Sequence, residues 1–264
     1  GRLVSLDQDP DAVQTARARL AGLPATVVQI NFRYAGQALE GLGIEKINGA
    51  LLDLGVSSPQ LDQAERGFSY HEDAPLDMRM DRSQGMTAAD LLAEVSEGEL
   101  TRILREYGEE KWASRISDFI IKRRKTGKIE TTGQLVDVIK AAIPASARRE
   151  GPHPAKRTFQ AVRIEVNNEL EQLERAIDRF CDVLLPGGRL CVITFHSLED
   201  RIVKEAFNRR LNPCTCPKEF PVCVCGKVSD VNKVTGKPIV AGEEELKRNP
   251  RARSAKLRVI EKKG

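Results

Sequence analysis

The sequence predicts an α/β fold: an open parallel sheet covered by helices, interrupted by an all-helical insertion. Apolar runs alternate with helical segments before residue 55 and again toward the C-terminus, a pattern typical of parallel sheets with helices on both faces. Between these regions only helical periodicity remains. We therefore expect a sheet domain in two parts, residues 1–83 and 166–264, with a helical insert over residues 84–165.

The N-terminal region carries the alternation most clearly. Residues 3–6 are a short apolar run, and Asp9 followed by Pro10 is typical of a helix start, because aspartate caps free backbone N–H groups and proline fits the first turn. Residues 25–30 and 47–54 give two further apolar runs rich in β-branched residues. These features predict strands joined by helices.

The predicted insert has well-marked helix starts. Thr87, Ser96 and Thr131 each precede an acidic or amide residue by three positions, the capping-box pattern, and Pro144 ends the last of these helices. A long amphipathic stretch follows over residues 158–184, and its spacing is helical.

The last part of the chain returns to strands. Pro, Gly and Gly at residues 186–188 predict a turn, and residues 189–195 a buried strand. Ser197 is expected to cap a helix, a polar segment containing cysteines follows, and residues 256–261 predict a final strand.

Composition sets only broad limits. The 264 residues include 42 Lys and Arg against 38 Asp and Glu, a net charge of +4, which mildly favours polyanionic partners. No apolar run approaches the roughly twenty residues of a membrane span. We expect a soluble cytoplasmic protein without a membrane partner; its oligomeric state, a dimer included, stays open.

Three residues follow the ends of the first predicted strands, where open parallel sheets bind their ligands. Asp7 could accept hydrogen bonds from ribose hydroxyls, although Asp9 competes for that role. Phe32 could cover an adenine or simply pack in the core. Asp53 holds a carboxylate at the edge of an apolar run, which is costly unless the group is paired or functional.

Two further segments carry polar chemistry. The loop at residues 55–60 offers hydroxyls and an amide directly after Asp53. A basic stretch could contact phosphates or could be a solvated surface; it comprises His153, Lys156, Arg157 and Arg163, with residues 122–125 as a second patch.

Other classes of site receive little support. Cys214, Cys216, Cys223 and Cys225 could surround zinc, but one-residue spacing within each pair departs from the usual two to four, and we expect no metal. No Gly-x-Gly-x-x-Gly follows a strand and no Gly-x-Ser-x-Gly is present, which argues against nicotinamide enzymes and α/β-hydrolases.

Six longer strings, together spanning nearly the whole chain, resemble the RsmH (MraW) family. They are LDLGVSSPQL at residues 52–61, ERGFS at 65–69, PLDMRMD at 75–81, HPAKRTFQAVRI at 153–164, FHSLEDRIVK at 195–204 and NPRARS at 249–254. The resemblance implies a class I (Rossmann-like) methyltransferase with an inserted helical domain for substrate recognition. It also implies methyl transfer from S-adenosylmethionine (SAM) to the N4 amine of a cytidine in small-subunit ribosomal RNA.

The resemblance also implies roles for particular residues. Asp7, Phe32, Asp53 and Gln60 match cofactor-site positions. The family's glycine-rich loop and the strand before it would precede Gly1, so we expect them to be absent from this chain.

The expected chemistry follows from the nucleophile. A cytosine amine is a weak nucleophile, so alignment and hydrogen-bond acceptors should activate it. We expect Asp53, or a carbonyl in the loop of Ser57, Ser58 and Pro59, to act as that acceptor. The base should be unpaired or flipped, and held by the basic stretch together with His196.

The partner expected is small-subunit ribosomal RNA or the assembled small subunit. Two other interpretations remain open: a non-catalytic RNA-binding or ribosome-assembly protein on the same fold, and a zinc module built by the cysteines that docks the RNA. SAM binding by intact protein distinguishes the first, and metal analysis tests the second.

Overall fold

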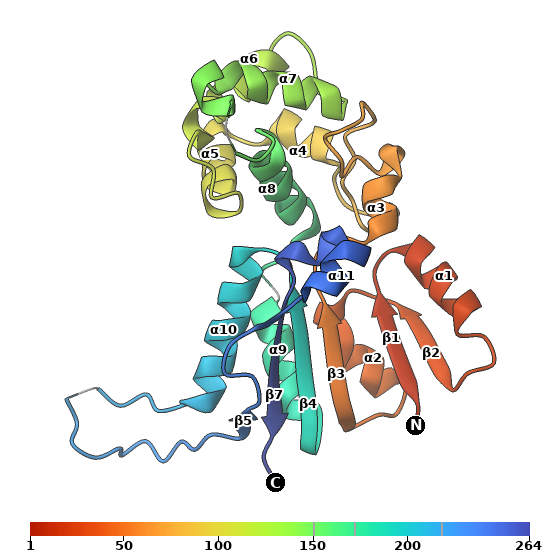
Figure 1. Cartoon of the computed structure of the whole chain (residues 1–264), viewed down its shortest axis with the longest axis vertical. Coiled ribbons are helices and arrows are strands. Elements are labelled where there is room, and N and C mark those ends of the chain that lie inside the picture. Colours follow the sequence, from red (N-terminus) through yellow and green to blue (C-terminus); the bar gives the residue numbers. More distant parts are fainter. Residues whose placement is uncertain (150, 172, 218) are drawn as a thin grey trace. The chain divides into compact units, whose positions relative to one another are not determined.

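The computed structural model describes residues 1–149, 151–171, 173–217 and 219–264, which form a mixed α/β structure with two compact units. Unit 1 comprises residues 1–55 and 170–264, and unit 2 comprises residues 56–169. Figure 1 shows the strands gathered in unit 1, whereas unit 2 is built from helices and loops. Among the described residues, no helix is both long and apolar enough to cross a bilayer.

Unit 1 contains the strands and the helices that pack on them. Its elements are β1 (Leu3–Asp7), α1 (Pro10–Arg19), β2 (Ala25–Gln29), a 3-10 helix (Phe32–Tyr34), α2 (Ala35–Gly41), β3 (Ile47–Asp53), α9 (Leu173–Val183), β4 (Leu184–Thr194), α10 (Ser197–Leu211), β5 (Val231–Lys233), β6 (Ile239–Val240), α11 (Glu243–Arg248), a 3-10 helix (Pro250–Ser254) and β7 (Lys256–Lys262).

The strands form two hydrogen-bonded sheets, both in unit 1. β1 and β2 are a parallel pair, and the second sheet has the order β3-β4-β7-β5, with β6 also paired to β7. β3 and β4 are parallel, but β7 runs antiparallel to β4, β5 and β6. The expectation of one open parallel sheet is therefore wrong in this respect: the second sheet is mixed, and the strand expected last lies inside it.

Strand β3 has side chains on one face that are exposed and side chains on the other face that are buried. Leu51, in the middle of β3, is 65% exposed, whereas Leu52 is 5% exposed. The alternation arises because successive side chains point to opposite faces and only one face meets the core. That core joins β3 and β4 to apolar residues of α9 and α10, among them Ile177, Phe180 and Val203.

Unit 2 is organised around its own apolar core. Its elements are α3 (Ser58–Asp62), a 3-10 helix (Ala64–Arg66), α4 (Ala88–Glu94), α5 (Glu97–Glu106), α6 (Ala113–Arg124), α7 (Thr132–Ala142), a 3-10 helix (Ala145–Arg148) and α8 (Lys156–Asn167). The three predicted caps are present: Thr87, Ser96 and Thr131 each accept a backbone N–H three residues on.

The second unit starts earlier than residue 84, where we placed the insert. Residues 56–83 form much of its core, because Phe68, Leu76, Met78 and Met80 are buried among the apolar side chains of its helices. The extended segment carrying these residues has no helical periodicity, which is why its sequence did not group it with the helices.

Two local expectations are compared with the structure. The amphipathic stretch over residues 158–184 carries most of α8 and all of α9: α8 ends where Asn168 adopts a left-handed conformation with φ 50°, and α9 begins at Leu173. Gln172 within the stretch lies outside the described residues. The cap of α10 is His196 rather than Ser197, since its side chain accepts the Glu199 N–H.

Candidate active site

Asp7 and Asp9 divide two roles at the end of β1. Asp9 is 2% exposed and caps α1, its carboxylate accepting the Asp11 N–H at 3.0 Å. Asp7 remains exposed at the strand end, with its Oδ1 accepting the Asp9 N–H at 2.8 Å. Partial desolvation raises the pKa of Asp7, and the Asp9 charge adds to it. Asp7 is therefore the more exposed of the two carboxylates.

Phe32 lies just after β2, in the turn that leads into α2. Asn31 caps this turn by accepting the Arg33 N–H at 3.0 Å, and its amide donates to Gln8 Oε1 at 2.6 Å. Phe32 itself is half-buried against the core of unit 1. Phe32 is therefore partly exposed just after β2, the strand that pairs with β1.

Asp53 ends β3 beside a second acidic residue, Glu199. Desolvation raises the pKa of Asp53, and the charge of Glu199 raises it further. Glu199 is 2% exposed, and its Oε2 accepts the backbone N–H groups of Phe195 at 2.8 Å and His196 at 3.3 Å. Glu199 thus fixes the turn between β4 and α10 while contributing negative charge next to Asp53.

Gly55 occupies a position where only glycine fits without strain. Its φ is +84°, and an added Cβ would come within 3.6 Å of Phe195 and 3.9 Å of Glu199 Oε1. The chain can therefore turn sharply after Asp53 and pass close to the β4–α10 turn.

The loop after Gly55 enters unit 2 and is locked by a capping box. Ser57 caps α3, its N–H donates to Gln60 Oε1 at 2.9 Å, and the Gln60 N–H donates back to Ser57 Oγ at 3.4 Å. Gln60 is 5% exposed, so it orders this loop, while Ser57, Ser58 and Pro59 are exposed. The sequence did not predict this cap.

His153 belongs to an aromatic cluster in unit 2. Its ring stacks on Tyr70 with centroids 4.6 Å apart and an interplanar angle of 7°, and Tyr70 meets Phe159 edge to face. Desolvation lowers the pKa of His153, helped by the charges of Lys140 and His71. A stacked imidazole kept neutral in this way is a hydrogen-bonding and stacking group.

The basic residues of α8 differ in how far they are engaged. Lys156 and Arg157 are exposed in the first turn, where Arg157 also donates to the Glu109 carbonyl at 2.8 Å. Arg163 instead forms a bidentate pair with Glu169, at 2.8 and 2.9 Å, with both side chains mostly buried. Arg163 is therefore part of the fold, and the first turn carries the accessible charge.

In unit 1, Asp7 ends β1, Asp53 ends β3 and Phe32 follows β2, and these three strands point the same way in Figure 1. His196 lies at the next strand end as the cap of α10. Glu199 was missed as a site residue: in the sequence it matched a capping pattern, and only the turn after β4 reveals its proximity to Asp53. Ser57 to Gln60 and the α8 residues belong to unit 2.

Comparison with known proteins gives a consistent result. A family model described as the MraW methylase family matches residues 1–263. Proteins named ribosomal RNA small subunit methyltransferase H are similar over 99% of this chain: that of Symbiobacterium thermophilum is 59% identical, and that of Clostridioides difficile is 54% identical. The chain covers 83% and 85% of these relatives, respectively.

Proposed function

Since the chain belongs to the MraW methylase family, we propose that it transfers a methyl group from SAM to the exocyclic N4 amine of a cytidine in small-subunit ribosomal RNA. The protein is a ribosomal RNA methyltransferase. The target atom, the residues that act on it and the class I methyltransferase fold are our proposal. We propose the cytoplasmic small subunit or its RNA as the substrate.

The strand ends of unit 1 fit the parts of SAM. A ribose needs a hydrogen-bond acceptor, and Asp7 offers an exposed carboxylate at the end of β1. An adenine needs an apolar face, and Phe32 is half-buried after the neighbouring strand. A sulfonium is a cation, and Asp53 with Glu199 makes the end of β3 acidic. These three matches, each at or just after the end of a strand of unit 1, are the observation that carries the proposal.

Asp53 is the proposed acceptor for the reacting amine. When bound, SAM supplies an electrophilic methyl group. The lone pair of a cytosine amine is delocalised into its ring, so an acceptor on an N–H group helps to localise that lone pair. Asp53 can accept this hydrogen bond and then take the amine proton, and its raised pKa makes it a better base than an ordinary aspartate.

The capped loop in unit 2 is the second source of acceptors. The Ser57–Gln60 capping box holds the backbone at Ser58 and Pro59 in one conformation, which avoids an ordering cost when substrate binds. We propose a carbonyl in this loop as the alternative acceptor to Asp53. Gln60 remains a proposed cofactor residue through its effect on the loop.

Unit 2 is the proposed RNA-recognition unit. Exposed Lys156 and Arg157 can contact phosphates, which position a nucleic acid without reading its bases. The stacked pair of His153 and Tyr70 offers aromatic surface for an unpaired base. His196, in unit 1, and Arg163 are proposed to act indirectly, because the first caps α10 and the second is paired with Glu169.

The deciding experiment incubates the protein with radiolabelled SAM and small ribosomal subunits that lack the modification, then identifies the labelled nucleoside. N4-methylcytidine is the expected product. Label in another nucleoside contradicts the proposed atom. SAM binding without transfer contradicts the proposed substrate, and RNA binding without SAM binding supports a non-catalytic assembly role instead.

A further inference from the structure

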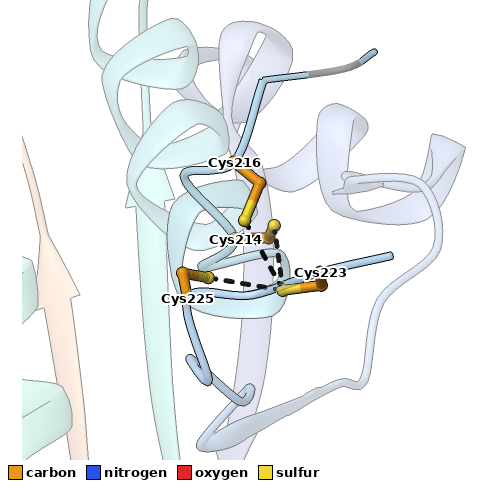
Figure 2. Close-up of side chains that lie close together, drawn as sticks. All are labelled: Cys214, Cys216, Cys223 and Cys225. Atoms are coloured by element: carbon orange, nitrogen blue, oxygen red, sulfur yellow. Dashed lines mark hydrogen bonds between the residues drawn. The ribbon is translucent and has the colours of Figure 1, made fainter. Parts of the chain in front are cut away.

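The connection between α10 and β5, residues 212–230, gathers four cysteines outside the proposed active site. Cys214 and Cys223 are exposed, and Cys216 and Cys225 are half-buried. Figure 2 shows their four sulfur atoms pointing toward one another from two stretches of the same loop. Lys218, within this connection, lies outside the described residues.

The distances between the sulfur atoms are short and similar. Cys223 Sγ lies 3.4 Å from Cys214 Sγ, 3.4 Å from Cys225 Sγ and 3.9 Å from Cys216 Sγ. All four sulfurs lie within 4.8 Å of one another. Four ligands at about 2.3 Å around a tetrahedral zinc ion are separated from each other by about 3.8 Å. The cluster therefore has the size of a tetrathiolate zinc site.

A backbone N–H group points at one of the sulfur atoms, as is expected around thiolates. The Val224 N–H donates to Cys216 Sγ at 3.4 Å. Gly226 follows Cys225 with φ +65°, a left-handed turn directly after the last cysteine. A hydrogen bond such as that to Cys216 stabilises the deprotonated sulfur that metal binding requires.

Apolar packing does not account for the position of this loop. Val222 and Val224, which flank Cys223, are 71% and 72% exposed. The two ends of the loop are fixed, since Arg210 donates to Asp230 at 3.2 Å, but the segment between them carries its own ordering cost. Weak S–H hydrogen bonds among thiols are too small to offset that cost. The binding free energy of a metal ion held by four thiolates is large enough to offset it.

We propose that Cys214, Cys216, Cys223 and Cys225 bind a zinc ion that orders this loop. Four protein ligands leave no open coordination position, so the ion is structural and not catalytic. The thiols release their protons to solvent on binding. One-residue spacing within each pair had favoured a protein without metal; the fold overrides that argument because each pair supplies two neighbouring corners of one tetrahedron.

The test is metal analysis of the full chain purified without added zinc. We expect about one zinc per chain, four sulfur ligands at about 2.3 Å by X-ray absorption, and visible ligand-field bands of a tetrahedral tetrathiolate after exchange for Co²⁺. Cys223→Ser and Cys216→Ser should lose the metal. Cys191→Ala, in β4 and outside the cluster, should retain it.

Three results would overturn the proposal. The wild-type chain could contain no zinc and fail to bind Co²⁺ after reduction. Its intact mass could be lower by two or four hydrogens, showing disulfides in place of thiolates. It could contain iron with the spectrum of a ferric tetrathiolate. Chelation supplies a readout separate from catalysis: removing zinc should make residues 212–230 sensitive to protease while the circular dichroism of the rest of the chain is retained.

Discussion

Asp200 on α10 and Arg258 on β7 form a two-point ion pair, with Nε to Oδ1 at 2.7 Å and Nη2 to Oδ2 at 3.1 Å. Both side chains are mostly buried, at 13% and 14% exposure. The pair attaches the helix that begins at the proposed active site to the strand at the centre of the mixed sheet. Arg258 and Lys256 hold the pKa of Asp200 below its ordinary value of 3.8.

Asp200→Asn should lower the free energy of unfolding by about 2 kcal/mol, because Arg258 would lose its charged partner in a poorly solvated place. A carboxylate with a lowered folded pKa contributes stability above its unfolded pKa, and this contribution is lost as the pH falls through the folded pKa. Urea unfolding should thus show a smaller difference between wild type and variant at acid pH than at pH 7. Glu244→Gln, in an exposed pair with Arg248, should change stability by less than about 0.5 kcal/mol.

Asp7 and Asp9 are two residues apart, but substitution of Asp9 should lower stability whereas substitution of Asp7 should weaken SAM binding. Asp9→Ala removes the α1 cap and should cost about 1 kcal/mol of stability. Asp7→Asn keeps the oxygen that accepts the Asp9 N–H, so stability should hold while SAM binding weakens. Calorimetric titration and urea unfolding of both variants check this. Equal loss of stability in the two variants would contradict the assignment of Asp7 as the ligand.

Asp53 and Glu199 predict a pH effect. Asp53→Asn should lower kcat on the order of 100-fold or more if Asp53 takes the amine proton, while the exposed Glu40→Gln on α2 should leave it unchanged. Glu199→Gln removes the charge that raises the pKa of Asp53. The acid limb of the kcat profile should therefore move to lower pH, because Asp53 stays deprotonated there. If the acid limb of the kcat profile does not move in Glu199→Gln, the titration that causes it belongs to a group other than Asp53.

The sequence predicts where strands end, but it does not predict which distant residues strand pairing brings close together. Asp7, Phe32 and Asp53 could be placed because apolar runs, caps and parallel topology locate them by local rules. Glu199 could not, since its proximity to Asp53 depends on the pairing of β3 with β4. Likewise, the position of β7 between β4 and β5 depends on long-range antiparallel pairing.

The basic residues of α8 should separate into two groups. Lys156→Ala and Arg157→Ala should weaken RNA binding across sequences and reduce the slope of log K against log salt by about 1 each if they contact phosphates. Arg163→Ala should instead cost about 2 kcal/mol of stability, because it leaves Glu169 without its bidentate partner. Filter binding at several salt concentrations measures the first effect and urea unfolding the second.

Gly67 and Gly85 both have positive φ, at +73° and +77°, but differ in their surroundings. At Gly67 an added Cβ would lie 2.4 Å from the Pro75 carbonyl and 2.6 Å from the Asp77 nitrogen, whereas nothing lies within 4 Å at Gly85. Gly85→Ala should therefore cost only the conformational strain of about 1 to 2 kcal/mol. Gly67→Ala adds a clash with backbone that cannot move away, because Leu76 and Met78 are packed in the core. The loss of stability should therefore exceed that of Gly85→Ala by at least about 2 kcal/mol. Thermal unfolding of the two variants compares them directly. Equal losses of stability would mean that the turn at Gly67 can shift. Residues 56–83 would then be held against the helices of unit 2 less tightly than their burial indicates.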